Sequence, residues 1–509
     1  MQNPIVRFET LGCKLNQIES ESAARAFSDG GFDCRMDSVS SASSIDLHTI
    51  LCIVNTCTVT AKAEQKCRRV IRLLLQKYPR AAILVTGCYA QLDACLLNAI
   101  DKRIAVLGGR RKDALVRLPE FLHSFFNAYT GGTAEQKWCA DENPPHCGEN
   151  ELCRGELLAA ELRTLYYAED VAADMRPFEE LKQAAFVLST DTFLQHSRPS
   201  LKIQDGCDNR CSYCRICFAR GPSVSLEAPK VLERVLQLER AGHREVVLTG
   251  VNLGQYRFEA GGLTSLLAYL LHNTSHIAFR LSSLHPQIVD EALCRVLSDE
   301  RIRPHFHLSV QSGSDTVLKA MRRPYNADCV KQAVERLRSV KKCAFIACDI
   351  IAGFPGETDE EFTKTAELCR SCNFSWIHAF PFSPRPGTAA YTMKNTVVSA
   401  AARTRVHELT LIAEAQKKAY IESCIGKRFK AVIEKFRIGE VRAVTENFLH
   451  VRIKHSSDAS ADFAQSGGKP EKRGEIPENR GGSEVVVRIE AVNEAGFRGE
   501  DCEAFAVLT

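Results

Sequence analysis

Three cysteines stand close together in the stretch Gly206-Cys207-Asp208-Asn209-Arg210-Cys211-Ser212-Tyr213-Cys214. Their C-x3-C-x2-C spacing puts the thiols of Cys207, Cys211 and Cys214 on one short loop. Thiolates are the usual ligands of iron–sulfur clusters, and three of them bind three irons of a 4Fe–4S cube. The fourth iron then stays open to a substrate, as a catalytic zinc ion keeps one position free. A structural zinc knuckle is the alternative interpretation of the same spacing.

Cys217 extends this pattern to C-x3-C-x2-C-x2-C. Four thiolates would close the cluster, and a closed cluster carries electrons but does not bind a substrate; they would equally suit a zinc ion. The residues after Cys217 are Phe218-Ala219-Arg220-Gly221, which fit a continuing active-site loop. We therefore expect an open cluster and leave the role of Cys217 undetermined.

Three further cysteines share a position relative to predicted strands. Cys13 follows a strand predicted over residues 5–10, Cys57 one over residues 49–54, and Cys88 one over residues 81–85. Helices predicted over residues 16–27 and 61–77 separate these strands, which indicates a parallel sheet. The carboxyl ends of parallel strands meet at one edge, where open α/β sheets bind their ligands. We therefore expect a second three-cysteine cluster there, the alternative being three buried loop thiols.

The segments around these motifs define the fold class as α/β. Residues 1–130 form a predicted parallel α/β domain. Residues 193–423 again alternate strand and helix, with strands predicted over residues 245–248, 278–281, 305–310, 344–351 and 375–380. Such repeats over about 220 residues favour a full or partial (βα) barrel. Residues 424–509 contain short β-rich runs, which predict a small β-barrel with a flexible loop near residues 456–482.

Residues 131–192 differ in composition from both neighbouring domains. Twelve Asp and Glu face four Lys and Arg between residues 135 and 180. The segment also contains Pro144-Pro145 and three cysteines, Cys139, Cys147 and Cys153, whose spacing matches no four-ligand metal pattern. We interpret it as an acidic insertion or linker, with a metal site as the alternative.

Composition excludes several classes of protein. Of the 509 residues, 45% are apolar and 25% are charged, which is the balance of a globular protein and excludes a disordered or collagen-like chain. The apolar runs are far shorter than the ~20 residues that span a bilayer. Residues 1–8 lack the pattern of a secretory signal, so we expect a cytoplasmic protein without a membrane segment. The 22 cysteines then point to metal ligation or redox chemistry for some thiols and to simple burial for the rest.

Charge alone says little about partners. The net charge of +4 is too small to identify one. Residues 401–455 carry twelve Lys and Arg against six Asp and Glu, which fits binding to an RNA backbone. A solvated charged face explains the same count.

Several motifs, taken in order along the chain, resemble the methylthiotransferases, a family of radical S-adenosylmethionine enzymes. They are T-L-G-C-K-L-N-Q, V-N-T-C-T-V-T, T-G-C-Y-A-Q, G-C-D-N-R-C-S-Y-C, L-T-G-V-N-L-G-Q-Y, H-F-H-L-S-V-Q-S-G-S-D, G-F-P-G-E-T and F-P-F-S-P-R-P-G-T. The resemblance runs from about residue 5 to the C-terminus, with the acidic segment and the 456–482 loop as additions. It implies a radical S-adenosylmethionine partial barrel for residues 193–423. For residues 424–509 it implies a TRAM-like RNA-binding domain.

The same resemblance implies two 4Fe–4S clusters and S-adenosylmethionine as cofactors. The cluster on Cys207, Cys211 and Cys214 would bind S-adenosylmethionine and cleave it to a 5′-deoxyadenosyl radical. The cluster on Cys13, Cys57 and Cys88 would carry the sulfur to be inserted. A radical suits this task, because an aromatic C–H bond next to ring nitrogens offers no usable acid–base route.

Other candidate site residues rest on weaker grounds. Asn252, Ser309, Gln311 and Asp349 lie at or near predicted strand ends, where they could contact S-adenosylmethionine or adenosine. Turn formation explains polar residues at such positions equally well. Arg385 is a candidate for gripping a phosphate or carboxylate of the substrate, with a surface salt bridge as the alternative.

Family resemblance also narrows the substrate. The known choices are isopentenyladenosine in tRNA, threonylcarbamoyladenosine in tRNA and an aspartate of a ribosomal protein. The L-G-C-K, H-F-H-L-S and F-P-F-S-P-R-P-G-T motifs are most similar to the threonylcarbamoyladenosine type, which acts on C2 of the modified base at position 37. The expected partners are tRNA, a flavodoxin- or ferredoxin-like electron donor and a sulfur source. The isopentenyladenosine type, and a non-catalytic iron–sulfur RNA-binding protein in which Cys217 caps the cluster, are the alternatives.

Overall fold

A computed structural model describes residues 3–130, 154–173, 178–188, 198–437, 440–453, 483–498 and 502–509. The chain packs as two compact units. The first unit comprises residues 1–190, 202–226 and 383–391, and the second comprises residues 191–201, 227–382 and 392–509. Cys139, Cys147, Cys153 and the predicted loop at residues 456–482 lie outside the described residues.

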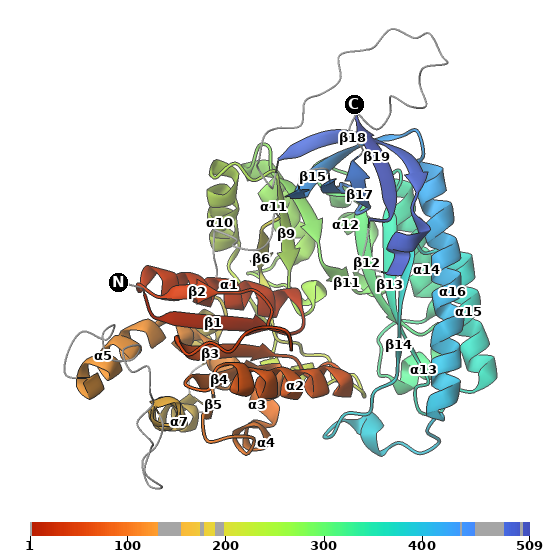
Figure 1. The fold of residues 1–509 in the computed structure, drawn as a ribbon. Coiled ribbons are helices and arrows are strands. Elements are labelled where there is room, and N and C mark those ends of the chain that lie inside the picture. The colour runs from red at the N-terminus through yellow and green to blue at the C-terminus, as the bar shows by residue number, and fades with distance from the viewer. Residues whose placement is uncertain are drawn as a thin grey trace. The chain divides into compact units, whose positions relative to one another are not determined.

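A five-stranded parallel sheet forms the centre of the first unit (Figure 1), in the order β2-β1-β3-β4-β5. Its strands are β1 (Ile5–Thr10), β2 (Asp33–Arg35), β3 (Thr49–Thr56), β4 (Ala82–Gly87) and β5 (Ile104–Val106). The helices between them are α1 (Lys14–Asp29), α2 (Ala61–Lys77), α3 (Cys88–Leu92) and α4 (Ala94–Asn98). The predicted parallel α/β class is confirmed. The sequence pattern missed β2 and β5, because three-residue strands are too short to display a period.

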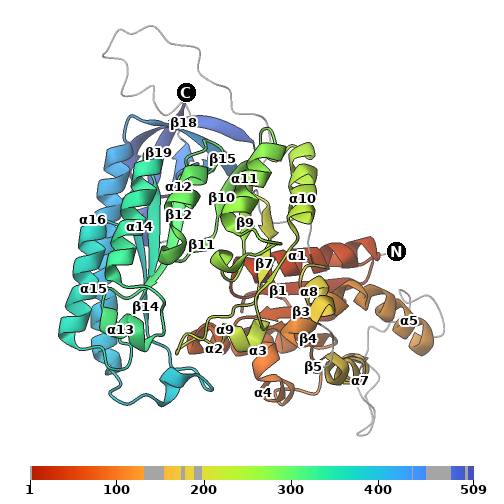
Figure 2. The same cartoon turned by 180° about the vertical axis from the view of Figure 1, so that it is seen from behind.

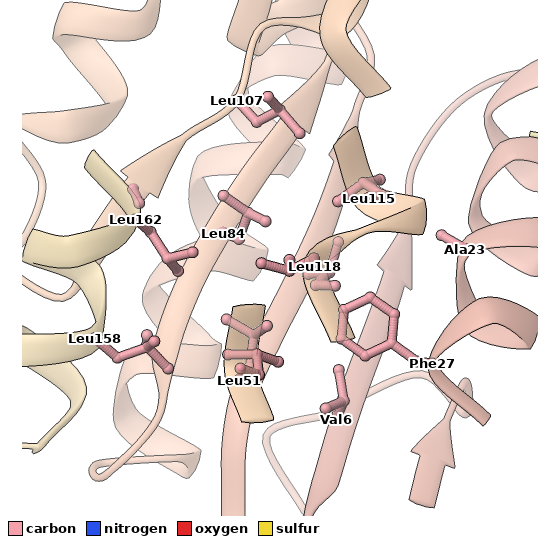
Figure 3. Packing of buried hydrophobic residues seen from close by; sticks show 14 of the residues in the cluster. Val6, Ala23, Phe27, Leu51, Leu84, Leu107, Leu115, Leu118, Leu158 and Leu162 are labelled. Carbon is pink, nitrogen blue, oxygen red and sulfur yellow. The ribbon is translucent and has the colours of Figure 1, made fainter. Parts of the chain in front are cut away.

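Alternate residues of the sheet face two different cores, as the period of a strand requires. Leu51 and Leu84 belong to the core shared with α1, α5 (Leu118–Thr130) and α7 (Arg154–Ala173), and Figure 3 shows this packing. Cys52 of β3 belongs to the opposite core, which includes α2. Leu158 and Leu162 of α7 are fully buried, and each contributes about 2 kcal/mol. Helix α7, which lies in the segment predicted to be an acidic linker, therefore packs into the core of the first unit.

The second unit contains an open partial barrel of parallel strands. These are β9 (Glu245–Thr249), β10 (Ala278–Leu281), β11 (Ser283–Leu284), β12 (His305–Gln311), β13 (Phe345–Ala352) and β14 (Trp376–Pro381). They form sheets in the orders β10-β9-β6, with β6 at Ser200–Lys202, and β11-β12-β13-β14. Only Ser282 separates β10 from β11, so one nearly continuous strand links the two sheets. The predicted partial (βα) barrel is confirmed.

Helices alternate with these strands. They are α10 (Ala228–Arg240), α11 (Leu263–Asn273), α12 (Glu291–Leu297), α13 (Asp315–Ala320), α14 (Ala327–Val340) and α15 (Asp359–Cys372). Figure 2 shows α14 and α15 covering one side of the β11–β14 sheet. Helix α15 begins after an N-cap, because the Thr358 hydroxyl accepts a hydrogen bond from the Glu361 N–H at 3.3 Å.

A small closed barrel ends the chain, as predicted. Its strands are β15 (Arg428–Arg437), β16 (Glu440–Thr445), β17 (His450–Ile453), β18 (Glu484–Val492) and β19 (Ala504–Leu508). They close in the order β15-β16-β17-β19-β18 and follow the long helix α16 (Ser399–Cys424). Closure leaves no unpaired strand edge. Among the described residues, no helix is long and apolar enough to cross a membrane.

Candidate functional site

Cys13, Cys57 and Cys88 lie at the carboxyl ends of three neighbouring strands. Cys13 is the N-cap residue of α1 after β1, Cys57 directly follows β3, and Cys88 opens α3 after β4. A 2-1-3-4-5 strand order reverses direction between β1 and β3, and sheets of this type bind ligands in the crevice at that reversal. The structure thus brings together the three cysteines that the sequence placed on one edge.

Burial destabilises the thiolate form of these cysteines unless a positive charge lies nearby. Cys57 and Cys88 are buried, whereas Cys13 is exposed. Burial raises the pKa of the Cys57 thiol to about 12. Burial also raises the pKa of Cys88, and the charges of Arg220 and Lys112 oppose that rise. A buried thiolate therefore requires a cation, which is the role a metal cluster fills.

Both candidate donor sets consist of thiols alone, which are the usual ligands of iron–sulfur clusters. In the part of the chain that the structure describes, no three His, Cys, Asp or Glu side chains are arranged to hold one metal ion. A 4Fe–4S cube does not need such convergence, because each thiolate binds a different iron. Each cysteine set offers the three thiols that an open 4Fe–4S cube needs.

Asn16 fixes the loops that carry the first set. Its side-chain amide is buried and donates to the carbonyl of Leu11 at 2.9 Å and to that of Thr56 at 3.1 Å. These carbonyls lie two residues before Cys13 and immediately before Cys57. One amide thus holds two of the three cysteine loops in register.

The loop of Cys207, Cys211 and Cys214 packs within the same compact unit as the first set. It follows β7 (Gln204–Asp205), and the Cys207 N–H donates to the Gly221 carbonyl at 3.0 Å. Gly206 has φ +70°, and a Cβ there would lie 1.9 Å from the Pro222 carbonyl oxygen. Only glycine fits such a position, so the turn into the loop depends on it.

Cys217 lies close to this loop, on helix α9 (Ile216–Arg220). Its buried Sγ is 3.9 Å from the Cys214 carbonyl oxygen. Burial raises the pKa of the Cys214 thiol to about 12, and the neighbouring thiols of Cys211 and Cys217 add to that rise. A cavity of about 480 Å³ is lined by both Cys207 and Cys217. The extra thiol is therefore a neighbour of the cluster loop.

A group of buried charges beside the cysteines was not predicted. We call it the buried charge network, and its members are Glu19, Lys112, Lys202, Asp205 and Arg220. They come from α1, the 3-10 helix η1 (Gly109–Val116), β6, β7 and α9. No sequence period links residues from five separate elements, so only the folded chain reveals the group.

Arg385 has a different environment from the two that the sequence suggested. Its guanidinium is 2% exposed and contacts the carboxylate of Glu64 and, at 3.1 Å, the hydroxyl of Thr58. It belongs to the segment 383–391, which packs within the first unit, where Ser383 Oγ accepts from the Ala61 N–H at 3.0 Å. The salt bridge is thus buried and next to Cys57. Substrate contact by Arg385 stays a prediction.

The candidates for contacting S-adenosylmethionine lie in the second unit. Asn252 caps the 3-10 helix η2 (Leu253–Gln255) by accepting from the Gly254 N–H at 3.2 Å. This is the turn-forming role that the sequence analysis gave as the alternative to contact with S-adenosylmethionine. Gln311 ends β12 with φ +71°, and such a backbone costs about 1–3 kcal/mol and is common at functional sites. Ser309 is partly exposed on the same strand.

Polar residues recur at alternate positions of the neighbouring strands. His307, Ser309 and Gln311 alternate with the fully buried Phe306, Leu308 and Val310 along β12. Asp349 of β13 lies 3.0 Å from His307 through Oδ1 and Nε2. His378 of β14 stacks on His307 with ring centroids 5.2 Å apart. This polar face includes two histidines that the sequence analysis missed, although their period of two was readable.

Burial, together with the adjacent His307, lowers the pKa of His378 to about 4. His378 is therefore neutral near pH 7. It offers a hydrogen-bond donor and acceptor and a flat ring, without a charge.

Two family models match parts of the chain. Residues 201–369 match the radical SAM superfamily, and residues 5–109 match "Uncharacterized protein family UPF0004". The chain is 42% identical over 469 residues to the threonylcarbamoyladenosine tRNA methylthiotransferase MtaB of Treponema pallidum, covering 88% of this chain and 94% of the relative. It is 30% identical over 442 residues to the tRNA-2-methylthio-N(6)-dimethylallyladenosine synthase of Bartonella henselae, covering 84% and 86%.

Among solved structures, the chain is similar to the radical S-adenosylmethionine methyltransferase TsrM from Kitasatospora setae. The TM-score is 0.47 at 15% identity, over 77% of each chain.

Proposed function

Since this chain belongs to the methylthiotransferase family of radical S-adenosylmethionine enzymes, we propose that it adds a methylthio group to C2 of N6-threonylcarbamoyladenosine at position 37 of tRNA. Its cofactors are two 4Fe–4S clusters and S-adenosylmethionine. One observation carries the proposal: Cys13, Cys57 and Cys88 meet at the carboxyl edge of the sheet, in the compact unit that also contains the Cys207 loop.

We assign one cluster to each cysteine set. Cys207, Cys211 and Cys214 hold the cluster that binds S-adenosylmethionine, and Cys13, Cys57 and Cys88 hold the cluster that carries sulfur. When bound, these cofactors supply the radical that removes the C2 hydrogen and the sulfur that replaces it. The protein's part is to fix both loops, which Asn16 and Gly206 do through backbone contacts and tight turns.

The polar face of β12 to β14 is our candidate for holding S-adenosylmethionine and the substrate adenosine. Gln311 and Asp349 offer hydrogen-bonding groups there, and Ser309 and Asn252 are further candidates. The neutral, stacked His378 suits a face that receives an aromatic base.

The C-terminal barrel is the candidate RNA-binding module. Exposed Lys427, Arg428 and Lys430 lie where β15 begins, and lysine and arginine bind phosphates. The proposed reaction also needs a flavodoxin- or ferredoxin-like electron donor, a sulfur source and a cytoplasmic tRNA pool.

The relative of the dimethylallyladenosine type, at 30% identity, makes the isopentenyladenosine base a second candidate substrate. Mass spectrometry of tRNA nucleosides from cells with and without the gene separates the two. We expect loss of 2-methylthio-N6-threonylcarbamoyladenosine and an unchanged level of the methylthiolated isopentenyl base. The opposite pattern would assign the chain to the second substrate.

A further inference from the structure

The buried charge network lies next to the first cysteine set. The side chains of Glu19, Lys112, Lys202, Asp205 and Arg220 are at most 10% exposed. Burying five charged groups is costly unless each is paired and hydrogen-bonded. The contacts of Arg220 show how the network meets this requirement and what it connects.

Arg220 makes hydrogen bonds to residues near both cysteine sets. Its Nη1 donates to Oδ1 and Oδ2 of Asp205 at 2.8 and 3.0 Å, and to Oε1 of Glu19 at 3.1 Å. Its Nη2 donates to Oδ1 of Asn16 at 2.8 Å. A planar guanidinium can bind such partners at once, which a lysine ammonium cannot do in the same geometry.

Two of these partners, Asp205 and Asn16, hold the backbone next to the cysteines. Asp205 lies two residues before Cys207, and its Oδ1 also accepts from the Gly206 N–H at 2.8 Å. Asn16 holds the carbonyls that precede Cys13 and Cys57. The Arg220 guanidinium thus contacts one residue that holds the first cysteine set and one residue that precedes the Cys207 loop.

The network also has a surplus of positive charge. Lys112, Lys202 and Arg220 are cations, whereas Glu19 and Asp205 are the two anions. Burial alone would raise the pKa of Glu19, but Arg220, Lys112 and Lys202 lower it well below its usual value. Asp205 accepts from Arg220 Nη1 at 2.8 and 3.0 Å and from Lys202 Nζ at 3.1 Å, so two cations pair with it. Both carboxyls are therefore ionised, and one positive charge is left over.

That surplus acts on the first cysteine set. Arg220 Nη2 and Lys112 Nζ both donate to Oδ1 of Asn16, at 2.8 and 3.4 Å. The amide of Asn16 in turn holds the carbonyls of Leu11 and Thr56, which precede Cys13 and Cys57. The excess charge thus lies one side chain away from the loops of the cysteines proposed to hold the sulfur-bearing cluster.

We propose that Arg220 is a positioning residue shared by both cysteine loops, and that the network's surplus positive charge raises the reduction potential of the cluster on Cys13, Cys57 and Cys88. Adding an electron makes that cluster more negative, and a fixed buried cation stabilises the more negative form. The inference rests on the proposed function only for the presence of this cluster. It does not depend on which base is modified.

The test measures the midpoint potential by EPR-monitored redox titration. The parent protein is the full chain with Cys207, Cys211 and Cys214 changed to Ala, so that only the first cluster contributes a signal. Arg220→Gln removes the charge and keeps hydrogen-bonding groups, and we expect a lower potential. Glu19→Gln removes a negative charge from the same network, and we expect a higher potential. Loss of packing alone would not shift the two variants in opposite directions.

Two further variants complete the design. Arg220→Lys keeps the charge, so the potential should stay near that of the parent, but iron should be lost faster because lysine cannot bridge Asp205 and Asn16. Arg280→Gln is the matched control: Arg280 is 1% exposed and pairs with Glu245 in the second unit, and we expect no shift in potential.

Unchanged potentials in both Arg220→Gln and Glu19→Gln, or shifts in the same direction, would overturn the proposal. If Arg220→Gln fails to bind iron, Glu19→Gln decides alone, because an unchanged or lower potential contradicts the surplus-charge argument. No tRNA is present in this measurement, so an error in the substrate assignment cannot produce either result.

Discussion

Gly12 lies directly against Cys57. A Cβ on Gly12 would come within 2.7 Å of Cys57 Cβ and 3.0 Å of Cys57 Sγ, and Gly12 has φ +112°. A side chain at this position must therefore displace the Cys57 loop, in addition to straining its own backbone. This contact links the residue before one proposed ligand to another proposed ligand on the next strand of the sheet.

We expect Gly12→Ala to lose the first cluster. Anaerobically reconstituted protein with both clusters should contain about eight irons per chain, and the variant about four. Gly31→Ala is the control, because Gly31 also has a positive φ of +86° but has no atom within 4 Å of the added Cβ. It should cost about 1 kcal/mol of stability and keep its iron. Equal iron in Gly12→Ala and Gly31→Ala would show that the contact with Cys57 has no bearing on the cluster.

Replacing Cys57 tests the division of labour between the clusters. A cube held by two thiolates is labile, so Cys57→Ala should abolish formation of methylthiolated tRNA. The Cys207 loop keeps its three ligands, so 5′-deoxyadenosine should still form from S-adenosylmethionine. Cys67→Ala is the control, since this buried thiol lies 3.7 Å from the Cys57 carbonyl oxygen without standing at a strand end. Normal methylthiolation by Cys57→Ala would make Cys57 a simple buried thiol.

The converse variant removes Cys207, Cys211 and Cys214 together. We expect it to lose about half of its iron and all cleavage of S-adenosylmethionine, because no other described cysteines form a compact loop of this spacing. The assay is anaerobic detection of 5′-deoxyadenosine by liquid chromatography. Cleavage retained by this variant would refute the radical assignment.

Most of what could be predicted about the site came from where its cysteines lie relative to the predicted strands. Cys13, Cys57 and Cys88 were recognisable because each follows an apolar run, and parallel strands bring such ends together. The environment of Arg385 could not be predicted, because its partner Glu64 is 321 residues away in the sequence. The buried charge network could not be predicted either, because its members are also far apart in the sequence. Helix α7 was missed as a core element because its sequence is acidic overall, although Leu158 and Leu162 are fully buried.

Cys217 provides a test of whether the catalytic cluster stays open. A catalytic cube must leave one iron without a protein ligand, so Cys217→Ala and Cys217→Pro should retain S-adenosylmethionine cleavage. Both variants are informative, since Cys217 Sγ makes only a weak 3.9 Å contact with the Cys214 carbonyl. A gain in affinity for S-adenosylmethionine, measured by the change in the EPR signal on titration, would instead show that Cys217 occupies the open iron.

The buried His285 predicts how stability depends on pH. Burial, together with the neighbouring charge of Arg323, lowers its pKa to about 3. An unfolded histidine has a pKa near 6.5, so between about pH 6.5 and pH 3 the unfolded chain takes up a proton that the folded chain refuses. Stability must therefore fall with decreasing pH across this window, by up to about 1.4 kcal/mol for each pH unit.

Replacing His285 should flatten this dependence. In urea unfolding of the metal-free chain followed by circular dichroism, we expect His285→Gln to lose less stability between pH 7 and pH 5 than the parent does. His272→Gln is the control. His272 lies at the end of α11 and is exposed to solvent in the folded chain as well as in the unfolded one. If His285→Gln and the parent lose equal stability over this pH range, then His285 is protonated as readily in the folded chain as in the unfolded one. Its burial then does not cause the loss of stability at low pH.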